Sequence, residues 1–168
     1  MLITPDQVVI GNWVRLKCQY GCPDFGKTLT CPPFTPPTEE VRKILSEYGK
    51  ILLLRFEQSS ITEDIGDNEF MKEFEKRQRE INDVTLKIEK KLLLRGYYKV
   101  FALEPGRCNL CSECAREIGK CRFPSEARPA PESLAVDMFG TVKNAGWSLE
   151  VKTNLFQSWT NYALILVE

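Results

Sequence analysis

Cysteines are the residues of this sequence best suited to chemistry. The chain has 168 residues with seven cysteines and no histidine. Without histidine, the commonest general base and the commonest neutral metal ligand are missing, and both Ser-His-Asp and Cys-His catalytic units are excluded. Any metal site in this chain must therefore use thiolates, carboxylates or backbone groups.

One group of cysteines lies in the second half of the chain, at Cys108, Cys111, Cys114 and Cys121. The first three are separated by two residues each, so their thiolates can converge on three corners of a cubane cluster. Bacterial ferredoxins open with the same Cys-x2-Cys-x2-Cys spacing, and their later cysteine follows after three residues and is next to a proline. Here six residues precede Cys121, and Pro124 lies three beyond it. The pattern predicts a 4Fe–4S cluster on these four cysteines.

Zinc is the alternative metal for this group. Structural zinc sites usually take two Cys-x2-Cys pairs separated by a longer loop, which three evenly spaced cysteines fit poorly. Basic residues near the group suit an anionic cluster, although Glu113, Glu117 and Glu126 weaken that argument. The basic residues are Arg107, Arg116, Lys120, Arg122 and Arg128.

A second group of cysteines comprises Cys18, Cys22 and Cys31, in a segment rich in glycine and proline. Three thiols are one fewer than a full ligand set. We expect them to hold a second metal or cluster whose fourth ligand is absent, exogenous, a carboxylate or a cysteine of the other group. An iron with an open position binds small molecules as a Lewis acid. The alternative is that these are buried structural cysteines.

Composition limits the class of protein. Hydrophobic residues make up 43% of the chain, and 23 basic residues balance 23 acidic ones. The balance gives no overall field for nucleic acid or an anionic membrane, so neither is expected as a partner. The N-terminus lacks the pattern of a signal peptide and no apolar run is long enough to span a membrane, so we expect a cytoplasmic protein. In a reducing cytosol, seven cysteines predict metal binding rather than disulfides.

Helices alternate with strands along the chain. Periodicity predicts helices at residues 38–48, 68–95 and 131–140, and strands at 50–57, 97–103 and 159–168. This order predicts an α/β or α+β fold, in which helices cover a small mixed sheet and a helix-connected pair of strands lies parallel. We expect one domain over residues 1–168, with an irregular cysteine-rich head at 1–37 and a cysteine-rich insert at 104–131.

The cysteine motifs resemble those of a known family. Cys18-x3-Cys22-Pro23 and Cys31-Pro32-Pro33, together with the Cys108–Cys121 pattern, are similar to a prokaryotic family of uncharacterised predicted metal-binding proteins, frequent in anaerobes and methanogenic archaea. Asp137, Thr141 and Asn144-x-Gly146-Trp147 also resemble its pattern. The segment Pro131–Leu134 departs from it. The resemblance implies metal binding and no particular reaction.

Three functions are compatible with these patterns. The first is an iron–sulfur protein that exchanges electrons with a redox protein partner. The second is an iron–sulfur enzyme in which the three-cysteine group binds a small-molecule substrate at an open iron. The third is a zinc-stabilised interaction module. Whether the protein is an enzyme is left open by the sequence.

Overall fold

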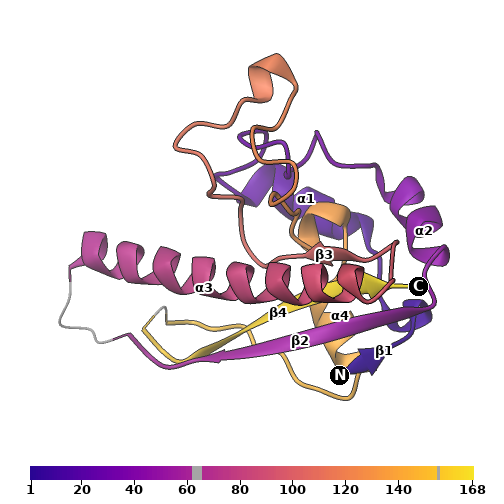
Figure 1. The fold of residues 1–168 in the computed structure, drawn as a ribbon. Helices are drawn as coiled ribbons and strands as arrows, with labels where there is room; N and C mark the ends of the chain where they lie inside the picture. Colours follow the sequence, from indigo (N-terminus) through magenta and orange to yellow (C-terminus); the bar gives the residue numbers. More distant parts are fainter. Residues whose placement is uncertain (62–65, 155) are drawn as a thin grey trace.

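A computed structural model describes residues 1–61, 66–154 and 156–168. The strands in this part of the chain form one sheet in the order β1-β2-β4-β3. They are β1 (Leu2–Ile3), β2 (Lys50–Gln58), β3 (Phe101–Leu103) and β4 (Trp159–Val167). The α-helices are α1 (Asn12–Gly21), α2 (Thr38–Ser46), α3 (Asp67–Leu94) and α4 (Met138–Asn144). The predicted fold class, helices packed on a small sheet, is confirmed (Figure 1).

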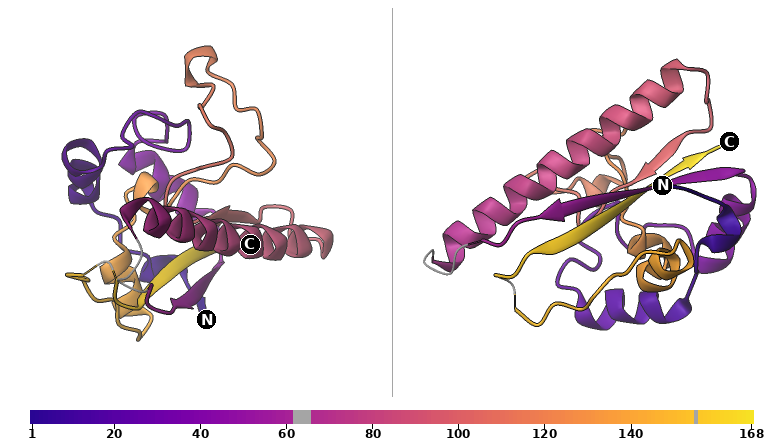
Figure 2. Two further views of the ribbon diagram at one scale, coloured as in Figure 1. Left: turned by 90° about the vertical axis from the view of Figure 1, so that its left-hand side faces the viewer. Right: turned by 90° about the horizontal axis from the view of Figure 1, so that it is seen from below.

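Strand β4 is central and is buried on both faces. Tyr162, Leu164 and Leu166 point to one face, where they join a cluster that includes side chains of α2 and α4. The alternating residues Ile165 and Val167 point to the other face and join a cluster with α3. Successive side chains of a strand point in opposite directions, so this near-continuous apolar strand supplies both halves of the core. Figure 2 shows α3 on one side of the sheet and α1, α2 and α4 on the other.

Helix α3 is longer than the sheet that it covers. Its 28 residues correspond to a length of about 42 Å. Ile88 and Leu92, in its C-terminal part, pack against the sheet. The preceding turns carry Gln78 and Arg79, which lie beside the segment that follows β3. The helix thereby joins the hydrophobic core to the cysteine-rich insert.

The sheet pairing differs from the expected mixed sheet. Each pairing of described strands is antiparallel, because β4 lies between β2 and β3 and runs opposite to both. Strands β2 and β3 therefore point the same way without being neighbours. This is a split β-α-β arrangement, and the parallel neighbours predicted from the connecting helix are wrong.

The head is more ordered than predicted. It contains the ten-residue helix α1, which carries Cys18 and ends at Gly21, directly before Cys22. The segment before α1 is held against α4, since Val9 N–H donates to Thr141 Oγ1 at 3.0 Å and Asn144 Nδ2 donates to Gln7 O at 3.2 Å. The glycines and prolines that suggested an irregular segment lie mainly after this helix.

The predicted helix at residues 131–140 is two separate pieces. A 3-10 turn spans Glu132–Leu134, and α4 begins only at Met138. Ala135 adopts the left-handed conformation with φ 61°, which interrupts the helix. Asp137 then caps α4 by accepting a hydrogen bond from Gly140 N–H. Strand β3 is also shorter than predicted, because residues 97–99 form a turn.

None of the helices in the described ranges combines the length and the apolar character that crossing a membrane requires.

Candidate metal centre

The cysteine-rich insert is attached to α3 at both ends. At its start, buried Gln78 donates from Nε2 to the carbonyl oxygen of Pro105 at 2.5 Å. At its return, Arg128 binds both carboxylate oxygens of Glu89, at 2.8 and 3.0 Å. Both side chains of this ion pair are buried. The insert itself has little regular structure, so these two anchors set the position of its cysteines.

The four cysteines of the insert line one cavity. It has a volume of about 740 Å³, and all four side chains are partly buried. Burial raises the pKa of the Cys108 thiol above its usual value. The Leu110 backbone opposes this effect, and the neighbouring thiols of Cys121, Cys114 and Cys111 raise the pKa further. The fold therefore brings the four predicted ligands into one neighbourhood.

Two backbone N–H groups donate to thiols of this group. Leu29 N–H, from the head, donates to Cys114 Sγ at 3.4 Å. Phe123 N–H donates to Cys121 Sγ at 3.4 Å. Hydrogen bonds to ligand sulfurs stabilise the thiolate and tune the potential of an iron–sulfur centre.

The three cysteines of the head form a second group. Cys18 is on α1, Cys22 follows its last residue, and Cys31 lies in the turns after it. The pKa of the Cys18 thiol is raised, first by burial and then by Cys22, and Cys31 adds to the effect. Its Sγ also lies 3.8 Å from the carbonyl oxygen of Glu132, to which it donates.

The head and the insert lie against each other (Figure 1). Besides the hydrogen bond from Leu29, Arg116 donates to the carbonyl oxygen of Gly26 at 2.8 Å. Arg107 lies 3.3 Å from Asp24 of the head and 3.2 Å from Glu75 of α3. The head segment at residues 24–31, which ends at Cys31, thus contacts the insert that carries the other cysteine group.

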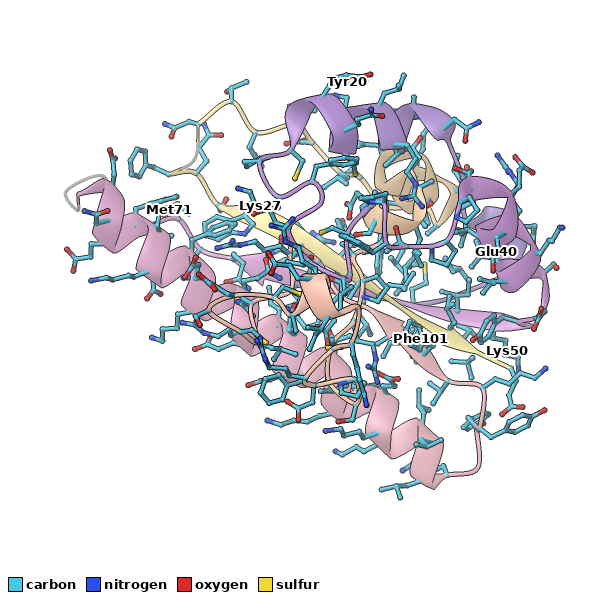
Figure 3. All side chains as sticks on the ribbon, turned by 90° about the horizontal axis from the view of Figure 1, so that it is seen from above. Tyr20, Lys27, Glu40, Lys50, Met71 and Phe101 are labelled. Carbon is cyan, nitrogen blue, oxygen red and sulfur yellow. The ribbon has the colours of Figure 1, made fainter. Side chains whose placement is uncertain are left out.

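The charges around the insert come from three parts of the chain. Arg107, Arg116 and Arg122 of the insert line its cavity. Lys27 of the head and Arg79 of α3 also line it, and Figure 3 labels Lys27 beside the insert. Neither Lys27 nor Arg79 is marked by a local sequence pattern as part of this site. Arg128, which was expected to surround the cysteines, pairs with Glu89 instead.

The cysteines are gathered without forming a closed ligand shell. In residues 1–61, 66–154 and 156–168, no three Cys, Asp or Glu side chains converge on a point that suits a single metal ion. Zinc requires its four ligands around one point, with Zn–S distances of about 2.3 Å. The donor set, four thiols around one cavity, suits a thiolate-bound metal centre, either zinc or an iron–sulfur cluster.

Other residues singled out in the sequence have structural roles. Asp137, Thr141 and Asn144 cap α4 or bind the segment before α1, as described above. The contacts of Thr141 and Asn144 fix the N-terminal segment to α4.

One family model matches the chain. It covers residues 1–167 and is described as Predicted metal-binding protein (DUF2284). No curated protein sequence shows a significant match, and no solved structure does.

Proposed function

Because the chain belongs to this family of predicted metal-binding proteins, we propose that its metal centre is a 4Fe–4S cluster on Cys108, Cys111, Cys114 and Cys121. Such a cluster, when bound, takes up and returns one electron. The protein then serves as an electron carrier or electron-transfer subunit.

The observation that carries this proposal is the common cavity of the four thiols. Its volume of about 740 Å³ exceeds the space of a four-coordinate ion with ligands at about 2.3 Å. The seven thiols are free of disulfides, so all are available as ligands. A reducing cytoplasm keeps thiols in that state, which supports a cytoplasmic location.

The chain's own residues prepare the site in two ways. Backbone N–H groups of Leu29 and Phe123 donate to the sulfurs of Cys114 and Cys121, as backbone N–H groups do to the ligand sulfurs of iron–sulfur clusters. Basic side chains from the insert, the head and α3 offset the negative charge of four thiolates. Both effects act in favour of an anionic centre.

The head cysteines are proposed to hold a second metal or cluster. Burial is the largest effect that raises the pKa of the Cys18 thiol, and Cys22 and Cys31 both raise it further. The head segment that ends at Cys31 binds the insert through Leu29 and Gly26. Two centres in adjoining segments suit transfer of an electron between them.

A redox protein is the proposed partner. Leu110 and Ile118 line the cysteine cavity and are 40% and 74% exposed. Exposed apolar residues with basic neighbours are typical of a surface that binds another protein. The small-molecule alternative would instead place a substrate at the three-cysteine group.

Electron paramagnetic resonance of anaerobically purified protein tests the proposal. Reduction with dithionite is expected to give the signal of a reduced 4Fe–4S cluster. The variant Cys111→Ser should lose this signal, whereas Cys22→Ser should retain it and affect only the second centre. A silent wild-type protein would contradict the proposal. A signal that shifts when a metabolite is added would favour the enzyme alternative.

A further inference from the structure

A second cavity lies beside the metal centre. Its volume is about 280 Å³, and it is formed by α3, the residue after β3 and both ends of the insert. Cys108 and Arg79 line this cavity as well as the larger one. A molecule bound in the smaller cavity would therefore lie next to a proposed cluster ligand.

Glu104 is the unusual residue of this cavity. The residue lines the cavity, yet it is only 6% exposed. Its Oε1 atom is buried and has no hydrogen-bond partner among the described residues. The nearby Arg128 is already bound to both oxygens of Glu89. A buried polar atom without a partner is destabilising, so its position calls for a functional explanation.

The carboxyl group of Glu104 is a donor at neutral pH. Its pKa is raised to about 8, chiefly by burial. Arg128 lowers the pKa, while Glu89 and Asp83 raise it further. A protonated carboxyl donates one hydrogen bond, and its strongest acceptors are carboxylate oxygens.

Two other side chains of the cavity add donors. Asn82 accepts from Gln78 through Oδ1 at 3.1 Å, which leaves its amide N–H groups to donate. Arg79 makes no ion pair with any described residue, and the residue lines the cavity. Asp83 and Glu126 also line the cavity. Their carboxylates repel anions, which disfavours a ligand with more than one negative charge.

We propose that this cavity binds a small monocarboxylate through Glu104, Asn82 and Arg79. The inference goes beyond the proposed electron transfer and does not depend on the identity of the metal. It gives the protein a specific small ligand beside Cys108. Glu104 would donate its carboxyl proton to a ligand oxygen in the cavity.

Calorimetric titration of the anaerobically purified protein tests this site. Acetate, propionate and butyrate are the probes, with succinate as the doubly charged comparison. The wild-type protein should bind a monocarboxylate more tightly than succinate. Between about pH 6.5 and about pH 9.5 its affinity should fall about 30-fold, because only the protonated carboxyl donates.

The variant Glu104→Gln separates this carboxyl from all other titrating groups. Glutamine keeps an N–H donor and does not titrate. The affinity of this variant for the monocarboxylate should therefore change by less than about threefold between about pH 6.5 and about pH 9.5. The cysteines and Asp83 are the same in both proteins. Glu117→Gln, which alters only the larger cavity, should behave as the wild type does.

Two results would overturn the inference. One is the absence of binding heat with every monocarboxylate. The other is an equal loss of affinity at high pH in the wild type and in Glu104→Gln. The iron content of the same samples is measured independently, so either result leaves the metal proposal standing.

Discussion

At the scale of single residues, the insert is held on α3 by a small number of buried polar contacts. Gln78, Glu89 and Arg128 supply them, and the buried Glu104 directly precedes the anchored Pro105. Burial removes each of these polar side chains from water, so a side chain stabilises the fold only if it finds a hydrogen-bond or ion-pair partner.

Removing one partner of the buried ion pair should be costly. Arg128→Met leaves Glu89 buried without its cation, and the expected loss in free energy of unfolding is about 3–5 kcal/mol. Urea unfolding measures it. Arg122→Met is the matched control, since Arg122 is exposed and, among the described residues, bonds only the Glu113 carbonyl. Equal losses in the two variants would contradict this role of the pair.

Gly106 is predicted to be required at the start of the insert. Its φ of 78° is left-handed, and a Cβ there would lie 3.0 Å from Cδ of Gln78. Gly119 has a φ of 64° with no neighbour within 4 Å. Gly119→Ala should therefore lose about 1 kcal/mol, and Gly106→Ala should lose more. Thermal unfolding of both variants measures these losses of stability. A smaller loss of stability in Gly106→Ala than in Gly119→Ala would contradict the prediction.

Glu104 should make stability depend on pH. Its pKa is raised from 4.5 to about 8 in the folded state, chiefly by burial, so the folded protein holds this proton more tightly than the unfolded chain. Stability should therefore fall as the pH rises from about 4.5 to about 8, by at most about 5 kcal/mol. Glu104→Gln should show a flatter dependence in denaturant unfolding. Parallel pH profiles for the two proteins would rule this out.

At the scale of elements, the regular parts of the fold follow from the sequence and the irregular parts do not. Helix α3 and strands β2 and β4 were predicted within a few residues, because long periodic patterns and caps are local signals. Helix α1 was missed because it contains tryptophan, valine and glycine, which have lower helix propensity than alanine or leucine. The antiparallel pairing was missed because the position of β4 depends on contacts distant in sequence.

The candidate site also has parts that could be predicted from the sequence and parts that could not. The spacing of Cys108, Cys111 and Cys114 predicted their common neighbourhood, which depends on local chain geometry. The contribution of Leu29 and Arg79 was not predictable, because each reaches the insert from a distant element. Glu104 was also missed, since a carboxylate in sequence carries no sign of its burial.

The head should influence the metal centre through one backbone group. Leu29→Pro removes the N–H that donates to Cys114 Sγ, whereas Leu29→Ala retains it. The proline variant should bind the metal of the insert about 10- to 100-fold more weakly, as losses of outer hydrogen bonds to metal ligands do. Competition with a chelator measures this affinity. Similar values for both variants would exclude the N–H group as the cause.

At the scale of the whole molecule, the sheet and α3 support two cysteine groups in adjoining segments. The head reaches the insert through Asp24, Gly26 and Leu29, and α3 reaches it through Glu75 and Gln78. The sheet supplies the core, and the thiols and the smaller cavity lie outside it. We propose that this arrangement serves to pass electrons between a metal centre and a partner.

The iron, acid-labile sulfide and zinc contents of anaerobically purified protein test the central claim most directly. The account predicts about four irons and four sulfides per chain for the insert site, with more if the head holds a second cluster, and little zinc. Cys114→Ser should lose the insert's share, and Cys18→Ser should not. Stoichiometric zinc without iron or sulfide would contradict the account.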